Sequence, residues 1–152
     1  MELFWTRLDG RSGHAAAYEL LAQAVSPLPE ICKTDRGKPY FADSQLHFSL
    51  SHTKNHAFCC VATQNLGIDA EETDRKVDLR LADKILSPTE KVRFAQVQDK
   101  STALLRFWVL KESYAKLTGK GLGDYLYETD FDPQDPRIQI IDGCFVAILE
   151  DK

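Results

Sequence analysis

The chain has 152 residues, enough for one well-packed core or for two small halves that share one. Its hydrophobic and charged fractions, 43% and 28%, are ordinary for a globular protein, and its formal net charge is −4. This charge argues against nonspecific binding to nucleic acid or to an anionic membrane, so any phosphate site must be a local basic cluster. No stretch is long and apolar enough to span a bilayer, and residues 1–8 do not resemble a signal peptide, so we expect a cytoplasmic protein. The cysteines lack CxxC spacing, and we expect them to be reduced thiols.

The first part of the chain predicts strands around one helix. Residues 3–8 mix aromatic and β-branched side chains, as short strands do. The Ala- and Leu-rich residues 14–25 predict a helix that Ser12 caps and that a proline-containing segment ends. Residues 46–52 alternate apolar and polar side chains, which indicates a half-buried strand whose serines face outward. The apolar run at residues 57–62 indicates a buried strand.

An acidic segment follows this run. If residues 68–71 are extended, Asp69 and Glu71 project from one face and apolar side chains project from the other. Two carboxylates on one face repel each other unless a cation or a basic group lies beside them. The alternative is a strand end whose acids are simply solvated.

Several helices are predicted next, and the sequence marks their ends. Residues 81–86 predict a short helix. Residues 87–90 have the spacing of a capping box, with proline at the first position of a helix over 88–98. A long helix is predicted over 99–118, where Gly119 is suited to the left-handed conformation that ends helices. Short strands are predicted after it at residues 125–131, 137–141 and 144–149, with a tight turn between the last two.

The long helix carries charged residues inside an apolar run. Lys111 and Glu112 interrupt the run, and Glu112 shares a face with Lys116 and Trp108, each four residues away. A carboxylate and two ammonium groups beside a tryptophan can bind a metal and a phosphate. An ion pair on an amphipathic helix is the commoner arrangement, and the helix alone does not decide between them.

Residues from separate segments form a consistent chemical set. The hard oxygen ligands, which suit Mg²⁺, are Asp69, Glu71 and Glu112. The cations near the same predicted strand ends and helix are Lys38, His52, Lys111 and Lys116, with Lys120 as a further candidate. An acidic metal site surrounded by cations is what a diphosphate substrate needs.

Five short segments have the order and approximate spacing found in one enzyme family. They are GKP at 37–39, FSLSHT at 48–53, GIDAE at 67–71, WVLKESYAK at 108–116 and GKGL at 119–122. In these segments the chain resembles the 4′-phosphopantetheinyl transferases, and most closely a shortened form of their surfactin-synthetase-activating type. Each segment alone is a weak signal, whereas the ordered set is specific.

The resemblance implies an α+β fold. Two similar α/β halves, residues 1–66 and 67–152, are expected to pack as an intramolecular pseudo-dimer in one compact unit. About 65 residues precede the GIDAE segment, enough to supply the first half within the chain, so we expect an active monomer.

The implied activity is transfer of the 4′-phosphopantetheine arm of coenzyme A to a serine of an apo acyl or peptidyl carrier protein. Mg²⁺ is the implied cofactor, and 3′,5′-ADP is the implied product; no nucleic acid or membrane partner is expected. One alternative is a shortened relative that binds coenzyme A or a carrier protein without turnover. Another is a Mg²⁺-dependent phosphodiesterase that releases phosphopantetheine to water.

The resemblance also implies roles for single residues. It places the metal on Asp69, Glu71 and Glu112, the 3′-phosphate of coenzyme A on Lys38 and His52, and the pyrophosphate near Lys111 and Lys116. The base would be Glu112 or a metal-bound water, and Lys116 would stabilise or protonate the departing 3′,5′-ADP. The alternative for Lys38 and His52 is that both are solvated turn residues. The basic residues available before the GKP segment are Arg11, Lys33 and Arg36.

Overall fold

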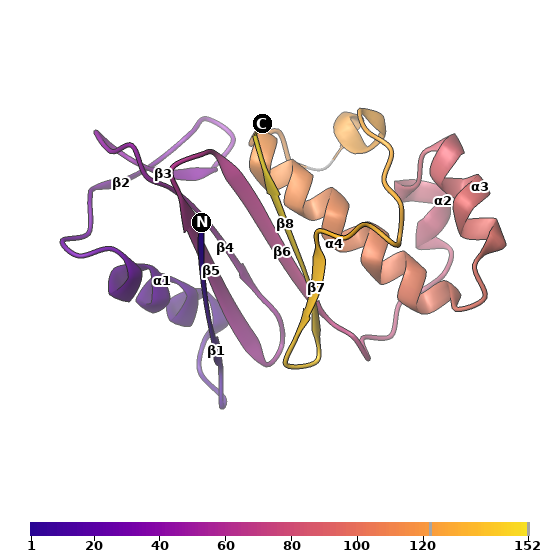
Figure 1. Cartoon of the computed structure of the whole chain (residues 1–152), viewed down its shortest axis with the longest axis horizontal. Coiled ribbons are helices and arrows are strands. Elements are labelled where there is room, and N and C mark those ends of the chain that lie inside the picture. The colour runs from indigo at the N-terminus through magenta and orange to yellow at the C-terminus, as the bar shows by residue number, and fades with distance from the viewer. Residues whose placement is uncertain (122, 152) are drawn as a thin grey trace.

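Two three-stranded antiparallel sheets form the centre of the computed structural model, which describes residues 1–121 and 123–151 (Figure 1). The first sheet has the order β1–β5–β4, formed by Glu2–Arg7, His56–Ala62 and His47–His52. The second has the order β6–β8–β7, formed by Leu66–Glu72, Cys144–Glu150 and Ile138–Ile141. The prediction of mixed α and β structure is therefore confirmed.

The two sheets share one topology. In each, an edge strand is followed by a helix, and the chain then returns as a strand pair whose second member lies in the middle of the sheet. The helix of the first sheet is α1 (Gly13–Ala24), which packs on β4 and β5. The helix of the second is α4 (Lys100–Thr118), which packs on β6 and β8.

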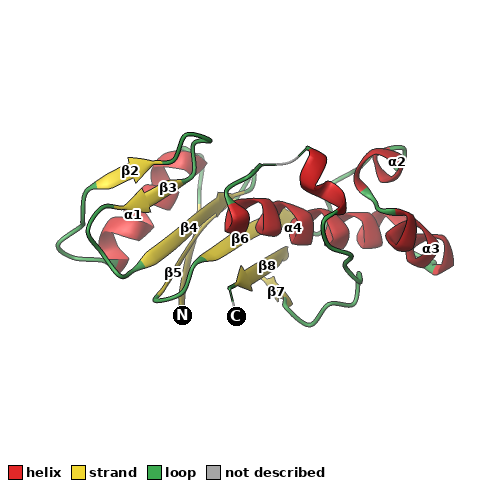
Figure 2. Ribbon diagram, turned by 90° about the horizontal axis from the view of Figure 1, so that it is seen from above, coloured by secondary structure: helices red, strands yellow, loops and turns green. Residues whose placement is uncertain are grey.

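Smaller elements extend the molecule at both ends (Figure 2). The hairpin of β2 (Ile31–Lys33) and β3 (Pro39–Phe41) lies beside α1. The short helices α2 (Leu81–Ile85) and α3 (Pro88–Gln96) lie at the opposite end, beyond the first turns of α4. A single 3₁₀ turn, Asp124–Tyr127, follows α4.

The helix ends agree with the sequence signals. The Ser12 hydroxyl accepts a hydrogen bond from the Ala15 backbone at 3.3 Å and caps α1. Ser87 and Glu90 form the complete capping box at the start of α3. Gly119 ends α4 with a φ of 68°, a left-handed conformation in which a residue with a side chain would be strained.

The prediction of a strand over residues 125–131 is wrong. The segment begins with the 3₁₀ turn instead, and its backbone is bonded to helix side chains. Lys111 donates to the Leu126 carbonyl oxygen, and the Phe131 N–H donates to Glu90 at 2.9 Å. These backbone groups are already bonded to side chains, so they are not available for a strand ladder. Leu122, the last residue of the GKGL segment, lies outside the described residues.

The serines of β4 were expected to face outward, and they are buried instead. Ser49 and Ser51 are 6% and 5% exposed because β6 packs against them. Ser49 Oγ accepts from the Ile68 N–H at 3.1 Å, and Ser51 Oγ accepts from the Ala70 N–H at 3.2 Å. These side chains satisfy backbone donors of β6 and so join the two sheets.

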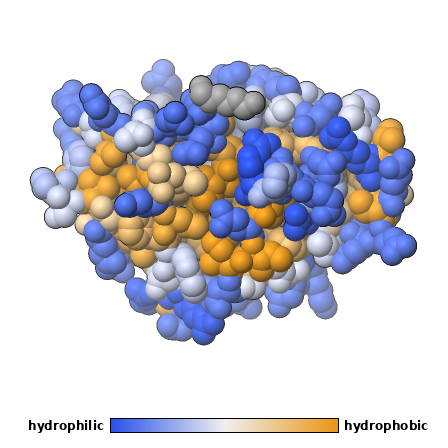
Figure 3. Space-filling model, in the orientation of Figure 1, coloured by the Kyte–Doolittle hydropathy of each residue, from blue (hydrophilic) through white to orange (hydrophobic). Residues whose placement is uncertain are grey.

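Apolar contacts also join the sheets. One cluster of buried side chains lies beneath α1 and another beneath α4. A third spans both sheets and includes Phe58, Cys60, Ile68, Cys144 and Val146. Figure 3 shows apolar residues gathered over the middle of the face that carries β1, β7 and β8. Among the described residues, no helix is long and apolar enough to cross a membrane.

Candidate active site

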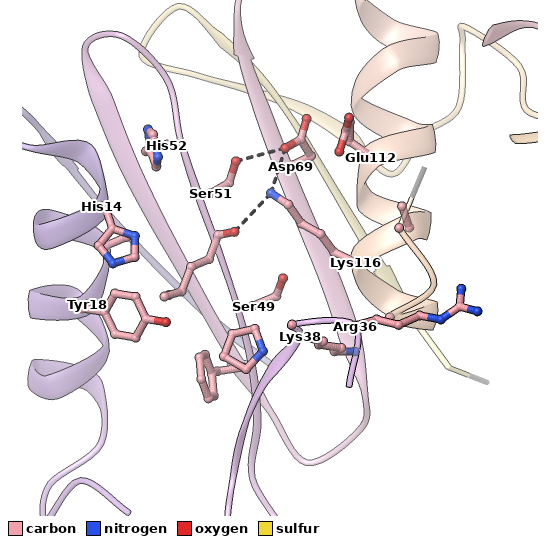
Figure 4. Close-up of a pocket in the computed structure, with 18 residues that line it drawn as sticks. His14, Tyr18, Arg36, Lys38, Ser49, Ser51, His52, Asp69, Glu112 and Lys116 are labelled. Atoms are coloured by element: carbon pink, nitrogen blue, oxygen red, sulfur yellow. Dashed lines mark hydrogen bonds and ion pairs between the residues drawn. The ribbon is translucent and has the colours of Figure 1, made fainter. Parts of the chain in front are cut away.

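A cleft of about 440 Å³ lies where the two sheets and their helices meet (Figure 4). On one side it is lined by α1, β4 and the turn between β2 and β3. On the other side it is lined by Asp69 from β6 and by Glu112 and Lys116 from α4. Residues far apart in the sequence therefore face one space.

Asp69 and Lys116 form an ion pair inside this cleft. Lys116 Nζ lies 2.9 Å from Asp69 Oδ1 and 3.1 Å from the Leu50 carbonyl oxygen. Ser51 also donates to Asp69 Oδ1, at 3.1 Å. Burial raises the pKa of Asp69, and this effect outweighs the opposing effects of Lys116 and Ser51. The carboxylate is thus a desolvated acceptor held by two donors.

Glu112 lies beside this pair, one helical turn before Lys116. Burial raises the pKa of Glu112 to about 7, and the nearby charges of Asp69 and Glu71 add to the rise while Lys116 opposes it. A carboxyl with this pKa exchanges a proton near neutral pH, which is a property of groups that act as acids or bases. The same crowding of carboxylates would favour a bound cation.

Glu71, the third expected metal ligand, is placed differently. It pairs with Arg75 four residues later and does not line the cleft. The ligand oxygens of Asp69, Glu71 and Glu112 do not form a group within 4.8 Å of one another. Asp69 and Glu112 nevertheless present hard oxygen donors beside open space. Such a set fits Mg²⁺, which takes few protein carboxylates and completes its coordination with water and phosphate.

Lys38 and His52 both line the cleft, but they do not converge. Figure 4 shows His52 and Lys38 toward opposite ends of it. Lys38 Nζ donates to Asn65 Oδ1 at 2.6 Å and to the Leu117 carbonyl oxygen at 2.8 Å. Burial lowers the pKa of Lys38. This arrangement does not support the expectation that both cations hold one phosphate group.

Lys111 is not brought to the cleft. Its side chain is 2% exposed, and its Nζ lies 2.8 Å from Glu90 Oε2 in the interior between α3 and α4. Lys111 immediately precedes Glu112, so the two side chains leave α4 in different directions. This arrangement does not support the expected contact of Lys111 with a pyrophosphate.

Two ring-bearing residues of the cleft were not singled out from the sequence, where Arg36 was named only as an available basic residue. His14 and Tyr18 lie on the cleft side of α1, with ring centroids 4.9 Å apart. Arg36 lines the opposite end and donates to the Lys120 carbonyl oxygen at 3.1 Å. The four-residue spacing of His14 and Tyr18 places both on one helix face, a signal that the sequence did contain.

Comparison with known proteins gives consistent matches to one family. A model of the 4′-phosphopantetheinyl transferase superfamily matches residues 65–144. The 4′-phosphopantetheinyl transferase HetI of Nostoc sp. is 40% identical over 95 residues, which cover 57% of this chain and 40% of HetI. The 4′-phosphopantetheinyl transferase Sfp of Bacillus subtilis is 36% identical over 89 residues, which cover 57% of this chain and 39% of Sfp.

A further relative shows the same extent of similarity. The 4′-phosphopantetheinyl transferase gsp of Aneurinibacillus migulanus is 30% identical over 92 residues, which cover 59% of this chain and 38% of gsp. The chain thus spans about two fifths of the length of these curated relatives. The superfamily match contains Asp69, Glu112 and Lys116, whereas Lys38 and His52 precede it.

Proposed function

The chain belongs to the 4′-phosphopantetheinyl transferase superfamily, and we propose that it transfers the 4′-phosphopantetheine arm of coenzyme A to a serine of an apo acyl or peptidyl carrier protein. The observation that carries the proposal is the convergence of Asp69, Glu112 and Lys116 on one cleft. Two acids and an ammonium group side by side suit a substrate with a pyrophosphate and a leaving group that gains negative charge.

We also propose that the molecule is an intramolecular pseudo-dimer and works as a monomer. The shared strand order and the equivalent helices α1 and α4 support two similar halves, divided near residues 66 and 67. One chain supplies both walls of the cleft, so no second subunit is needed to complete it. Light scattering at the concentration of the activity assay tests this, and an active trimer would contradict it.

Asp69 and Glu112 are the residues that would hold Mg²⁺. Glu71 would join them after breaking its ion pair with Arg75. Arg75 is exposed, so water can solvate its charge once Glu71 has left. When bound, the ion would neutralise charge on the pyrophosphate and orient it for displacement. The chemistry of the donors supports this choice of metal, since all three are carboxylates.

Two residues of the cleft would take up the proton of the carrier serine and stabilise the charge of the leaving group. The carrier serine oxygen attacks the phosphorus that bears the pantetheine arm, and the bond from this phosphorus to the bridging oxygen breaks. Glu112 accepts the serine proton, a role that its position at the cleft, beside the space open to the reacting groups, supports. Lys116 stabilises the negative charge that develops on the departing 3′,5′-ADP.

The rest of the cleft would bind the nucleotide. The rings of His14 and Tyr18 offer a surface on which the adenine can lie, because aromatic side chains stack favourably on bases. His52 lies against the first residue of α1, where helix N–H groups favour an anion. We assign the 3′-phosphate to this side of the cleft, beside His52, and the remaining phosphates to the facing side, near Asp69 and Lys116.

Mass spectrometry of apo carrier proteins incubated with coenzyme A and Mg²⁺ tests the activity. The expected result is a gain of one phosphopantetheine on the carrier serine together with release of 3′,5′-ADP. A carrier that binds but gains no mass would indicate a binding module instead. Release of phosphopantetheine to water, with or without carrier, would indicate a phosphodiesterase.

A further inference from the structure

A second group of metal-ligating side chains lies outside the cleft, where the two sheets meet. His56 begins β5, Glu72 ends β6 and Cys144 begins β8. His56 Nδ1 lies 3.1 Å from Glu72 Oε1 and 3.3 Å from Cys144 Sγ, and Cys144 Sγ lies 3.6 Å from Glu72 Oε2. Within the described part of the chain, these are the residues that form a group of three with ligand atoms within 4.8 Å.

These separations are close to those around a tetrahedral ion. Zinc binds sulfur at about 2.3 Å and nitrogen or oxygen at about 2.0–2.2 Å, so neighbouring ligand atoms are roughly 3.3–3.6 Å apart. The distances from His56 Nδ1 to Glu72 Oε1 and to Cys144 Sγ, 3.1 and 3.3 Å, lie near this range, and Cys144 Sγ lies 3.6 Å from the second carboxylate oxygen, Glu72 Oε2. An ion would therefore fit with small side-chain movements.

The other side of the His56 ring supplies a second, independent observation. His56 Nε2 lies 2.8 Å from Asp142 Oδ2, and Arg7 holds the two oxygens of Asp142 at 2.6 and 2.7 Å. Metal-binding histidines usually donate their second N–H to a carboxylate, which fixes the ring and increases its basicity. Here this contact directs Nδ1 toward Glu72 and Cys144.

We propose that His56, Glu72 and Cys144 form a structural Zn²⁺ site, with Asp142 as the positioning residue. A thiolate, an imidazole and a carboxylate together favour zinc over the hard cations Mg²⁺ and Ca²⁺. His56 is 6% exposed and Cys144 is fully buried, so these two ligands are shielded from solvent, and a water molecule would complete a four-coordinate site. A depression of about 280 Å³, lined by His56 and Asp142, gives the ion a route from solvent.

The site would connect the two halves of the molecule. His56 belongs to the first sheet, whereas Glu72 and Cys144 are paired across β6 and β8 in the second. None of the three lines the active-site cleft, so the proposal does not depend on the transferase activity. Without an ion, hydrogen bonds join His56 to Glu72 and Cys144, and the Thr53 hydroxyl donates to Glu72 Oε1 at 2.6 Å.

Titration of metal-free protein with Co²⁺, in excess Mg²⁺ to fill hard-ligand sites, tests the proposal. The expected result is one Co²⁺ per chain, with the intense visible bands of tetrahedral cobalt and a near-ultraviolet sulfur-to-cobalt band, both lost when Zn²⁺ is added. Cys144→Ser should abolish the sulfur band and weaken binding at least tenfold. Asp142→Asn should keep the band and weaken binding about 10- to 100-fold.

The matched control is Cys32→Ser, because Cys32 is a partly exposed thiol in β2, outside the cluster. This variant should keep the full spectrum and affinity. Absence of the sulfur band in the wild type, an unchanged titration in Cys144→Ser, or loss of the band in Cys32→Ser would overturn the proposal. Circular dichroism identifies any variant that does not fold, and the wild-type spectrum decides the question by itself.

Discussion

Gly67 and Ser113 bring β6 and α4 into direct backbone contact. A Cβ atom on Gly67 would lie 2.0 Å from the Ser113 carbonyl oxygen, and the Ser113 hydroxyl donates to the Gly67 carbonyl oxygen at 2.6 Å. Asp69 follows Gly67 by two residues and so faces the same side of β6. Glu112 and Lys116 flank Ser113 on α4. This close approach brings the cleft carboxylates and the lysine together where α4 crosses β6.

Gly67→Ala is expected to destabilise the protein strongly. The added methyl group would overlap backbone atoms of Ser113 and Leu117, which cannot move without shifting α4. We expect a loss of at least about 2 kcal/mol in the free energy of unfolding, measured by urea denaturation. Ser113→Ala is the matched control, because it removes the hydrogen bond without adding an atom and should cost about 1 kcal/mol. Equal losses in the two variants would contradict the steric explanation.

Lys111 and Glu90 provide a second prediction about stability. Their charged side chains are 2% and 0% exposed and 2.8 Å apart. Lys111→Met leaves a buried, unpaired carboxylate, so we expect a loss of about 3–5 kcal/mol in the free energy of unfolding. The double variant with Glu90→Gln keeps an oxygen for the capping box and should recover part of the loss.

The double variant also separates structure from binding. Lys111 does not line the cleft. A double variant that folds should therefore have a KM for coenzyme A close to that of the wild type. A double variant that is as stable as the wild type but has a much higher KM would instead place Lys111 at the substrate. Double-mutant cycles in urea measure the coupling between the two side chains.

Local sequence signals predicted the regular elements well, because they act over a few residues. The capping box at Ser87 and the glycine stop at Gly119 depend on neighbouring residues alone, and both are confirmed. The segment after Gly123 was mispredicted because Lys111 and Glu90, distant in sequence, bond to its backbone. Tertiary contacts of this kind override local strand propensity.

The candidate site was predicted in part for the same reason. Strand and helix periodicity placed Asp69, Glu112 and Lys116 on faces that turn out to share the cleft. The direction of Lys111 depends on its buried partner Glu90, which no periodicity reveals. The burial of Ser49 and Ser51 depends on how the two sheets pack, and alternation within β4 carries no information about that.

Asp69→Asn and Glu112→Gln are expected to lower kcat/KM for carrier modification by at least about 10²-fold. Each removes a negative charge that would hold the metal against the reacting pyrophosphate. Glu71→Gln is the comparison variant, and we expect a smaller loss because Glu71 must first leave its ion pair with Arg75 to reach the metal. Near-normal turnover of either first variant at saturating Mg²⁺ would rule out the proposed site.

Mg²⁺ binding is expected to weaken as the pH falls below neutrality. Burial, with the charges of Asp69 and Glu71, raises the pKa of Glu112 to about 7, and a protonated carboxyl does not bind the ion well. Isothermal titration calorimetry should therefore give a tighter Mg²⁺ affinity at pH 8 than at pH 6. In Glu112→Gln this difference should be much smaller. An affinity independent of pH in the wild type would contradict the assignment.

The same shift makes a prediction for the stability of the metal-free protein. The raised pKa of Glu112 means that the native state binds more protons than the unfolded state between pH 4.5 and about 7. The contribution of Glu112 to the free energy of unfolding therefore falls as the pH rises from 4.5 to about 7. Urea denaturation across the window should show a shallower pH dependence for Glu112→Gln than for the wild type. A steeper one would contradict the sign of the shift.

The last prediction concerns the 3′-phosphate of coenzyme A. His52 and Lys38 lie toward opposite ends of the cleft, and the Lys38 ammonium already donates to Asn65 and to the Leu117 carbonyl oxygen. We therefore expect that one phosphate group does not contact both cations. A charge-assisted contact contributes about 1.5–3 kcal/mol, which corresponds to about a 10- to 100-fold change in substrate use.

Dephospho-coenzyme A, which lacks the 3′-phosphate, distinguishes the two cations. The wild type should prefer coenzyme A, and His52→Ala should lose most of this preference because it removes the contact with that phosphate. Lys38→Ala should lower kcat/KM for both substrates to a similar degree, because Lys38 would contact a part of the molecule that coenzyme A and dephospho-coenzyme A share. The comparison rests on ratios of kcat/KM, so a general loss of activity cancels. If Lys38→Ala loses the preference and His52→Ala keeps it, the nucleotide lies in the cleft in the opposite direction.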